Sequence, residues 1–164
     1  MISVVGGGLV GGLLATGLAQ RGEPVELFER REDIRKGGAY GGRSINLAVS
    51  VRGLHALRSL GLDQEVLSRG IAMKGRMMHA VSGALTFQPY GVEDWQCIYS
   101  ISRAELNRQL LSAAEKAGVK IHFSKKLTSA SFVSGGGVEL GFEGESHRRE
   151  RVIGTDGSAS ALRG

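Results

Sequence analysis

The fold is decided by the stretch MISVVGGGLVGG, residues 1–12. It opens with a short, largely apolar run, which is typical of a buried parallel strand. Glycines then follow in G-x-G-x-x-G spacing, and apolar residues recur at helical spacing until Gly22. A second apolar run at residues 24–29 is interpreted as another strand. Together these segments predict a strand–helix–strand unit with a right-handed crossover.

The spacing of Gly6, Gly8 and Gly11 is typical of a dinucleotide site. The first glycine permits a tight turn, the second lets a pyrophosphate approach the backbone, and the third lets helix and strand pack closely. The phosphate would lie at the positive end of the helix. Glu29 ends the second strand, where an acidic side chain accepts hydrogen bonds from a ribose. We therefore predict NAD or FAD binding, with a glycine-rich turn beside a solvated glutamate as the alternative.

The rest of the chain alternates between helical and strand patterns, which predicts an α/β class. Ser82-Gly83 is expected at the turn of a β-hairpin over residues 73–90. Residues 36–50 are rich in glycine and are expected to form a loop. Helices are predicted at 52–60, 63–68 and 103–117, and strands at 119–123, 130–134, 138–142 and 151–154.

The charge balance favours an anionic partner. The net charge is +5, from 21 Lys and Arg against 16 Asp and Glu. Both nucleic acid and a phosphorylated cofactor would fit, but the basic residues are scattered and form no stripe interleaved with aromatics, so we expect no nucleic-acid partner. Cys97 is the only cysteine and the histidines lack ligand spacing, so we expect no disulfide and no metal site.

Targeting signals are not evident in this stretch of sequence. No apolar run approaches the roughly 20 residues that span a bilayer, and the chain opens directly on the first strand. We therefore expect no membrane segment here and a cytoplasmic location. The chain stops at residues 160–164, where a helix should begin after the last strand, so we expect it to be the truncated N-terminal part of a larger protein.

Several segments of the chain carry a resemblance to one family. Gly154-Thr155-Asp156-Gly157 ends the last strand; by itself it would be read as an Asp-Gly turn, but it is similar to the Asp-Gly motif of flavin hydroxylases. Further segments occur in the order found in the kynurenine 3-monooxygenase family of flavin-dependent aromatic hydroxylases, which the whole chain resembles. These are Gly42-Arg43-Ser44-Ile45-Asn46-Leu47-Ala48, Arg76-Met77-Met78-His79, Gln88-Pro89-Tyr90-Gly91, Tyr99-Ser100-Ile101-Ser102-Arg103 and Leu106-Asn107.

The resemblance implies both a fold and an activity. Residues 1–164 would form a Rossmann-like FAD-binding domain, in which residues 73–92 are a β-hairpin insertion from the substrate region. NADPH would reduce FAD, which would use O2 to hydroxylate L-kynurenine to 3-hydroxykynurenine in tryptophan degradation. The flavin carries this chemistry, so no catalytic side chain is expected.

The resemblance also implies roles for individual residues. Arg76 and Tyr90 would hold the substrate carboxylate, since a guanidinium can donate two parallel hydrogen bonds and a tyrosine hydroxyl a third. Ala48 would lie by the flavin, Arg103 near the pyrophosphate, Leu127 by the adenine and Asp156 near the ribityl or ribose. The cofactor-binding residues would thus be Gly6, Gly8, Val10, Gly11, Glu29, Arg30, Arg31, Ala48, Arg103, Leu127 and Asp156.

Alternatives to this activity remain open. The protein would also fit a hydroxylase of another aromatic acid, or a module that binds FAD without turnover. The sequence does not determine its oligomeric state.

Overall fold

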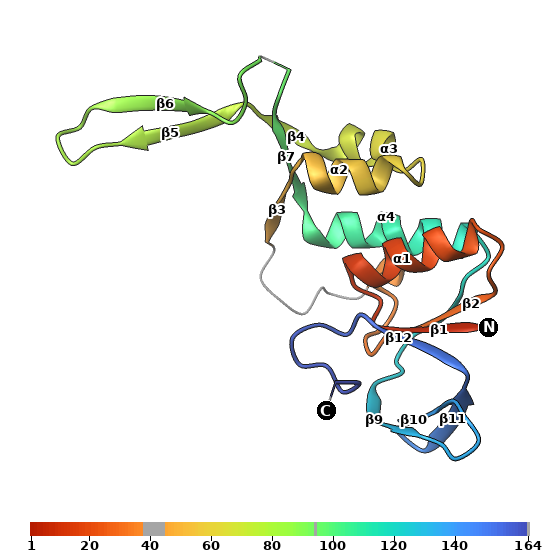
Figure 1. Ribbon diagram of the computed structural model, residues 1–164. Helices are drawn as coiled ribbons and strands as arrows, with labels where there is room; N and C mark the ends of the chain where they lie inside the picture. Colours follow the sequence, from red (N-terminus) through yellow and green to blue (C-terminus); the bar gives the residue numbers. More distant parts are fainter. Residues whose placement is uncertain (38–44, 94, 164) are drawn as a thin grey trace. The chain divides into compact units, whose positions relative to one another are not determined.

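The computed structural model describes residues 1–37, 45–93 and 95–163 (Figure 1). The chain forms two compact units. The first unit consists of residues 1–42 and 106–164, and the second consists of residues 43–105. The predicted hairpin therefore belongs to the second unit, whereas the glycine-rich turn belongs to the first. Of the segment at 42–48 that carries the resemblance, residues 42–44 lie outside the described residues.

A parallel sheet forms the centre of the first unit. Its strand order is β12 (Arg151–Gly154), β1 (Ile2–Val5), β2 (Val25–Phe28) and β8 (Lys120–His122), and all neighbours pair in parallel. Helix α1 (Leu9–Ala19) connects β1 to β2. The predicted strand–helix–strand unit and the α/β class are both confirmed.

Both faces of this sheet are covered, which explains why its strands read as continuous apolar runs. Residues on one face pack with side chains of α1 and α4 (Arg103–Lys116), and residues on the other pack against a second sheet (Figure 1). Because strand side chains alternate, neighbouring residues join different clusters. The helix-side cluster contains Ile2, Val4, Ala15, Val25, Leu27, Leu111 and Ala114, and the other contains Val5, Phe28, Leu127, Leu140 and Phe142.

The second sheet of this unit is antiparallel. Its order is β11 (Glu145–Arg149), β10 (Val138–Phe142) and β9 (Leu127–Phe132). Strand β10 was predicted with its observed bounds, and β9 was predicted in part, at residues 130–134, but β11 was not predicted, because its sequence ESHRR is wholly polar. Its pairing with β10 makes it a strand, and no apolar alternation marks it in the sequence.

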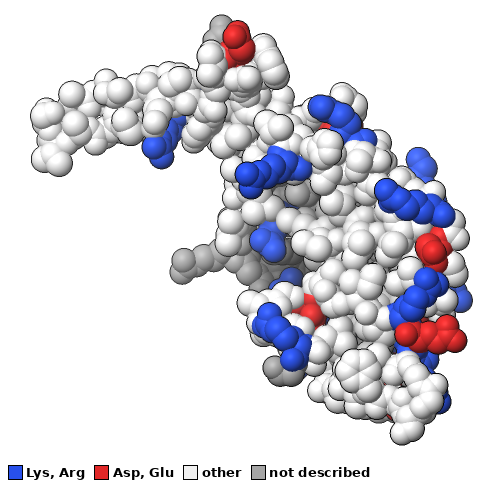
Figure 2. Space-filling model, in the orientation of Figure 1, with Lys and Arg blue, Asp and Glu red and all other residues white. Residues whose placement is uncertain are grey.

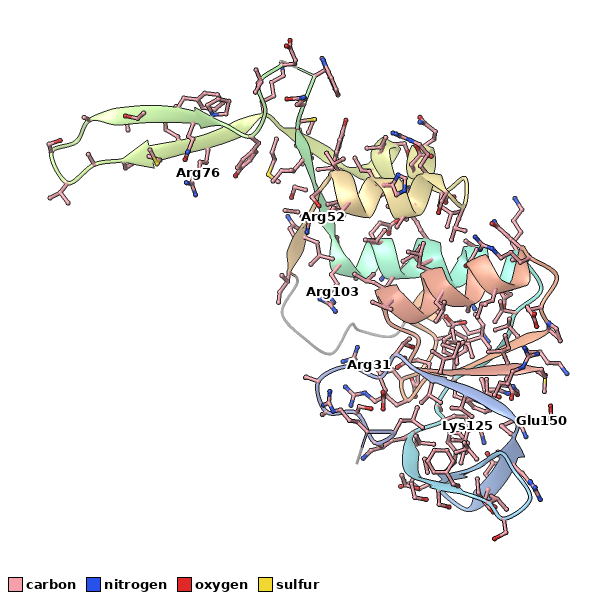
Figure 3. All side chains as sticks on the ribbon, in the orientation of Figure 1. Arg31, Arg52, Arg76, Arg103, Lys125 and Glu150 are labelled. Atoms are coloured by element: carbon pink, nitrogen blue, oxygen red, sulfur yellow. The ribbon has the colours of Figure 1, made fainter. Side chains whose placement is uncertain are left out.

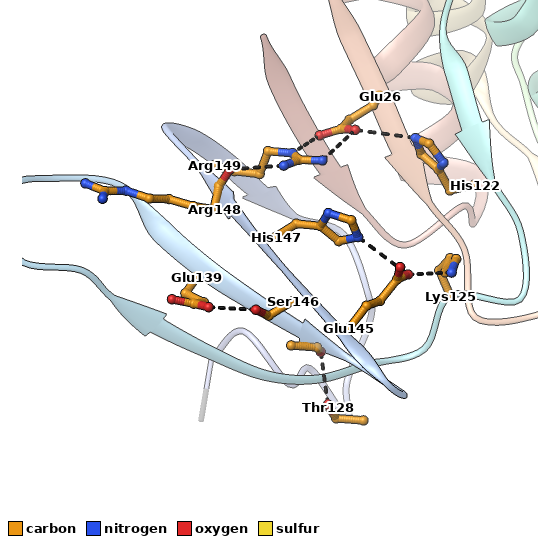
Figure 4. A network of polar contacts seen from close by, with 11 residues as sticks. Glu26, His122, Lys125, Thr128, Glu139, Glu145, Ser146, His147, Arg148 and Arg149 are labelled. Atoms are coloured by element: carbon orange, nitrogen blue, oxygen red, sulfur yellow. Dashed lines mark hydrogen bonds and ion pairs between the residues drawn. The ribbon is translucent and has the colours of Figure 1, made fainter.

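The two sheets are joined by a buried carboxylate, Glu26, which is 2% exposed (Figure 4). Ser3 Oγ donates to Glu26 Oε1 at 2.5 Å, Arg149 Nε donates to the same oxygen, and Arg149 Nη2 donates to Glu26 Oε2 at 3.3 Å. His122 Nε2 lies 3.4 Å from Glu26 Oε2. Burial alone would raise the pKa of Glu26, but the hydrogen bonds from Arg149 and Ser3 outweigh it and hold the pKa below 4.5. The network therefore contains a charged carboxylate.

The second unit is built on an antiparallel sheet of order β3 (Asn46–Val49), β7 (Ile98–Ser102) and β4 (Ile71–Met73). It also contains α2 (Val51–Arg58), α3 (Asp63–Arg69) and the predicted hairpin of β5 (Gly75–His79) and β6 (Leu85–Pro89), whose turn holds Gly83 at a φ of +85°.

The loop prediction for residues 36–50 was only partly right. Residues Ile34–Lys36 form a short 3-10 helix, η1, and β3 forms at Asn46–Val49, whereas residues 38–44 lie outside the described part. Strand β3 forms because it pairs with β7, which is distant in sequence. The glycine-rich segment before β3 favours a loop, so the sequence pattern alone did not predict this strand. No helix among the described residues is long and apolar enough to span a bilayer.

Candidate functional site

At two glycines of the turn between β1 and α1, an added Cβ would collide with the backbone of the chain itself. Gly6 has a φ of +108°, and a Cβ there would lie 2.5 Å from the carbonyl oxygen of Thr155. A Cβ at Gly11 would lie 1.8 Å from the carbonyl oxygen of Gly6. At Gly8, by contrast, a Cβ would meet no protein atom within 4 Å. The structure therefore leaves space beside Gly8, and the approach of a pyrophosphate there, which the motif implies, stays a prediction.

Glu29 lies beside this turn. Gly7 N donates to Glu29 Oε2 at 2.7 Å, and Arg31 N donates to Glu29 Oε1 at 2.9 Å. The backbone N–H of Glu29 donates to His122 O at 2.9 Å, which fixes the residue at the end of β2. Because each carboxylate oxygen has two lone pairs, both oxygens can accept a further hydrogen bond from a ribose hydroxyl. The structure thus brings Glu29 and the glycine turn together.

Glu29→Gln is expected to weaken FAD binding about 10- to 100-fold, because hydrogen bonds to a charged acceptor are worth roughly 1.5–3 kcal/mol. The amide can still accept from Gly7 N, so the turn should keep its form. Titration of the apoprotein with FAD, followed by flavin fluorescence, measures the change. Glu23→Gln, which removes the same charge from a glutamate paired with Arg151, is the control. Equal FAD affinity in wild type and Glu29→Gln would contradict the ribose role.

Thr155 ties the last strand to the glycine turn, a contact that the sequence analysis missed. Thr155 N donates to Val5 O at 2.7 Å, and the hydroxyl lies 2.8 Å from Gly6 O and 2.9 Å from Val5 O, within donating distance of both. The next residue, Asp156, accepts a hydrogen bond from Ala161 N through Oδ2 at 2.8 Å. The register of β12 against β1 pairs Gly154 with Val5 and so delivers Thr155 and Asp156 beside Gly6. Only this pairing could have revealed the contact.

The remaining candidates of the first unit are less closely grouped. Val10 is 67% exposed in the first turn of α1, and Arg30 and Arg31 are exposed just after β2. Leu127 is 8% exposed and belongs to the apolar cluster between the two sheets. The expected contacts of these residues with FAD stay predictions.

In the second unit, Arg76 and Tyr90 lie on the hairpin. Arg76 pairs with Gln88 across the strands, and Tyr90 N donates to Lys74 O at 2.9 Å, which extends the register by one pair beyond Gly75 and Pro89. Positions two apart in a strand share a face, so Arg76, Gln88 and Tyr90 lie on the same face of the hairpin. Figure 3 labels Arg76 on β5, and Figure 2 shows that much of the hairpin surface in view carries no charge. The register therefore places the two predicted substrate residues on one face of the hairpin, and their contact with a substrate stays a prediction.

Ala48 and Arg103 are also in the second unit. Ala48 is exposed on β3 and pairs with Ser100, and Arg103 is exposed at the first position of α4, as Figure 3 shows. The backbone N–H of Arg103 donates to Ile45 O at 3.1 Å, which connects the start of the helix to the start of β3. The expected positions of Ala48 by the flavin and of Arg103 near the pyrophosphate stay predictions.

Comparison with known proteins relates the chain to flavoproteins. The kynurenine 3-monooxygenase of Myxococcus xanthus (strain DK1622) is 51% identical to it over 166 residues, which cover 99% of this chain and 36% of the relative. The kynurenine 3-monooxygenase of Anopheles gambiae is 45% identical over 99% of this chain and 34% of the relative. The chain thus spans about a third of the length of these curated relatives.

Solved structures support the fold. The p-nitrophenol 4-monooxygenase of Pseudomonas putida DLL-E4 superposes with a TM-score of 0.83 at 22% identity, over 99% of this chain and 42% of that one. A 2-methyl-3-hydroxypyridine-5-carboxylic acid oxygenase gives a TM-score of 0.80 at 23% identity, over 99% of this chain and 40% of that one. The sequence model of the family described as "FAD binding domain" matches residues 1–164. This match covers the glycine turn, Glu29 and the Thr155-Asp156 segment alike, and the chain therefore belongs to the FAD binding domain family.

Proposed function

We propose that the full-length protein is an FAD-dependent monooxygenase that uses NADPH and O2 to hydroxylate L-kynurenine to 3-hydroxykynurenine. The observation that carries this proposal is the 51% identity, maintained over 99% of the chain, to a relative named kynurenine 3-monooxygenase. The arrangement of Arg76 and Tyr90 on one face of the hairpin adds support, since an amino-acid substrate presents a carboxylate.

The first unit binds the cofactor. FAD, reduced by NADPH, supplies the oxygen-activating chemistry. The N-terminus of α1 holds the pyrophosphate, because its unpaired N–H groups and the helix dipole favour an anion. Glu29 accepts hydrogen bonds from the adenosine ribose, and Asp156 is positioned by Thr155 close to the same turn. Each of these residues acts by position and charge.

The second unit contributes recognition of the substrate. Arg76 donates to both oxygens of the substrate carboxylate, and the Tyr90 hydroxyl donates a further hydrogen bond. No side chain acts as a nucleophile. The role of the hairpin is to hold the aromatic ring in line with the reacting oxygen, an effect that can contribute several kcal/mol.

Arg76→Ala in the full-length protein tests the substrate. It is expected to weaken L-kynurenine binding about 100-fold, because truncating one partner of a desolvated charge pair costs roughly 2–5 kcal/mol. FAD content should stay unchanged. Calorimetric titration of the FAD-loaded protein measures the affinity, and Arg69→Ala, which removes an exposed arginine of α3 paired with Glu105, is the control.

The outcomes of this experiment separate the alternatives. Unchanged kynurenine affinity in Arg76→Ala would contradict the assignment and would favour a hydroxylase of another aromatic acid. A wild-type protein that binds FAD but shows no kynurenine-stimulated oxidation of NADPH would be a binding module without turnover.

A further inference from the structure

The guanidinium of Arg76 is held by a cross-strand partner. Arg76 Nε donates to Gln88 Oε1 at 2.7 Å, and the two residues are direct partners in the register of β5 and β6. Among the described residues, this amide is the one polar partner recorded for the Arg76 side chain. Since Gln88 is uncharged, it fixes the arginine without neutralising it.

The bond to Gln88 affects how the guanidinium of Arg76 can bind a carboxylate. A guanidinium can bind a carboxylate side-on, through Nε and one Nη, or end-on, through both Nη atoms. The bond to Gln88 uses the single N–H of Nε, so the side-on mode requires that this bond break. Four N–H groups remain on the two Nη atoms. A carboxylate that binds Arg76 while this bond is kept therefore pairs end-on.

The same face of the hairpin holds the other proposed anchor. Tyr90 N donates to Lys74 O at 2.9 Å, so the pair of residues 74 and 90 follows the pair of Arg76 and Gln88 in register, two residues along. Gln88 and Tyr90 are therefore neighbours on one strand edge, facing the same side. A rotation of the guanidinium about its last bonds would change its position relative to Tyr90, and the Gln88 amide opposes that rotation.

We propose that Gln88 is a positioning residue, which orients Arg76 for end-on binding of the substrate carboxylate. The inference rests on the proposed function, because it requires that Arg76 binds an acid group. It assigns to Gln88 a selective effect on ligands that carry a carboxylate. A role limited to hairpin stability would affect all ligands alike.

The test compares two ligands in the full-length, FAD-loaded protein. Gln88→Leu is expected to weaken L-kynurenine binding about tenfold, which corresponds to the loss of one well-oriented hydrogen bond to a charged group. Binding of the decarboxylated analogue, which lacks the acid group, should change less than about twofold. Calorimetry measures both affinities. Thr86→Val, on the same strand and two residues from Gln88, is the matched control and should leave both unchanged.

A double-mutant cycle completes the test. In an Arg76→Ala background, Gln88→Leu should cause no further loss of kynurenine affinity, because the group that it orients is absent. If Gln88→Leu weakens binding of L-kynurenine and of the decarboxylated analogue equally, Gln88 has a structural role and the proposal is overturned. The proposal is also overturned if Gln88→Leu leaves the affinity for L-kynurenine unchanged while Arg76→Ala weakens it. If Arg76→Ala itself leaves the affinity for L-kynurenine unchanged, the proposed contact between Arg76 and the substrate is wrong, and the proposed role of Gln88 is wrong with it.

Discussion

Gly11→Ala is expected to weaken FAD binding about 100-fold or more and to lower the thermal midpoint of the apoprotein. The new methyl group would lie 1.8 Å from the carbonyl oxygen of Gly6 and 2.7 Å from the hydroxyl of Thr155. These are backbone and tightly bonded atoms, so α1 must move away from β1. Overpacking of this kind costs roughly 1–3 kcal/mol in stability, and the shift also displaces the N–H groups that we propose bind the pyrophosphate. FAD titration and a thermal melt of the apoprotein measure the two effects.

Gly8→Ala is the matched control for this prediction. A Cβ at Gly8 meets no protein atom within 4 Å, so the thermal midpoint of the apoprotein should stay close to that of wild type. The methyl group would instead occupy the space that we propose for the pyrophosphate, so FAD affinity should fall. If Gly8→Ala binds FAD like wild type, the opening at Gly8 is not where the cofactor approaches. If Gly11→Ala leaves both properties unchanged, the described packing of α1 on the turn is wrong.

Arg149→Met is expected to destabilise the protein by about 3–5 kcal/mol, because it leaves the carboxylate of Glu26 buried without its cation. The side chains of Arg149 and Glu26 are 21% and 3% exposed, so solvent cannot replace the lost partner. Urea unfolding followed by circular dichroism measures the change. Arg151→Met breaks an exposed ion pair with Glu23 and should cost at most about 1 kcal/mol. Similar losses in the two variants would contradict the importance of the buried pair.

The effect of Arg149→Met should depend on pH with a definite sign. In the wild type the pKa of Glu26 is lowered from 4.5, so its contribution to stability is present above that value and is lost as the pH falls through the folded-state pKa. In the variant the hydrogen bond and charge of Arg149 are lost, so burial, the largest influence on this carboxyl, is expected to raise the pKa of Glu26 and to favour its neutral form. The stability difference between wild type and variant should therefore shrink as the pH falls, first through the raised pKa of the variant and then toward the lowered pKa of the wild type. A difference that stays constant down to acid pH would contradict this account.

The local patterns of the sequence were sufficient for the elements that depend on local physics. The apolar run, the glycine spacing and Glu29 predicted the strand–helix–strand unit and the acidic residue beside its turn, which the structure confirms. The hairpin and its turn at Gly83 were likewise predictable, because a tight turn and its flanking strands lie within a few residues of each other. The resemblance to flavin hydroxylases rested on short segments of this kind, and the family match is consistent with it.

Tertiary structure alone decided the contacts between residues that are distant in sequence. Strand β11 is polar and β3 follows a glycine-rich segment, and each is a strand because a distant or neighbouring strand supplies its hydrogen bonds. Thr155 reaches the glycine turn through the parallel register of β12 and β1, and Arg149 reaches Glu26 from another sheet. The residue pattern of a segment indicates whether that segment is a helix or a strand, but it does not indicate which other segment it pairs with. These long-range pairings, and the site residues that they position, therefore appear only when the chain is folded.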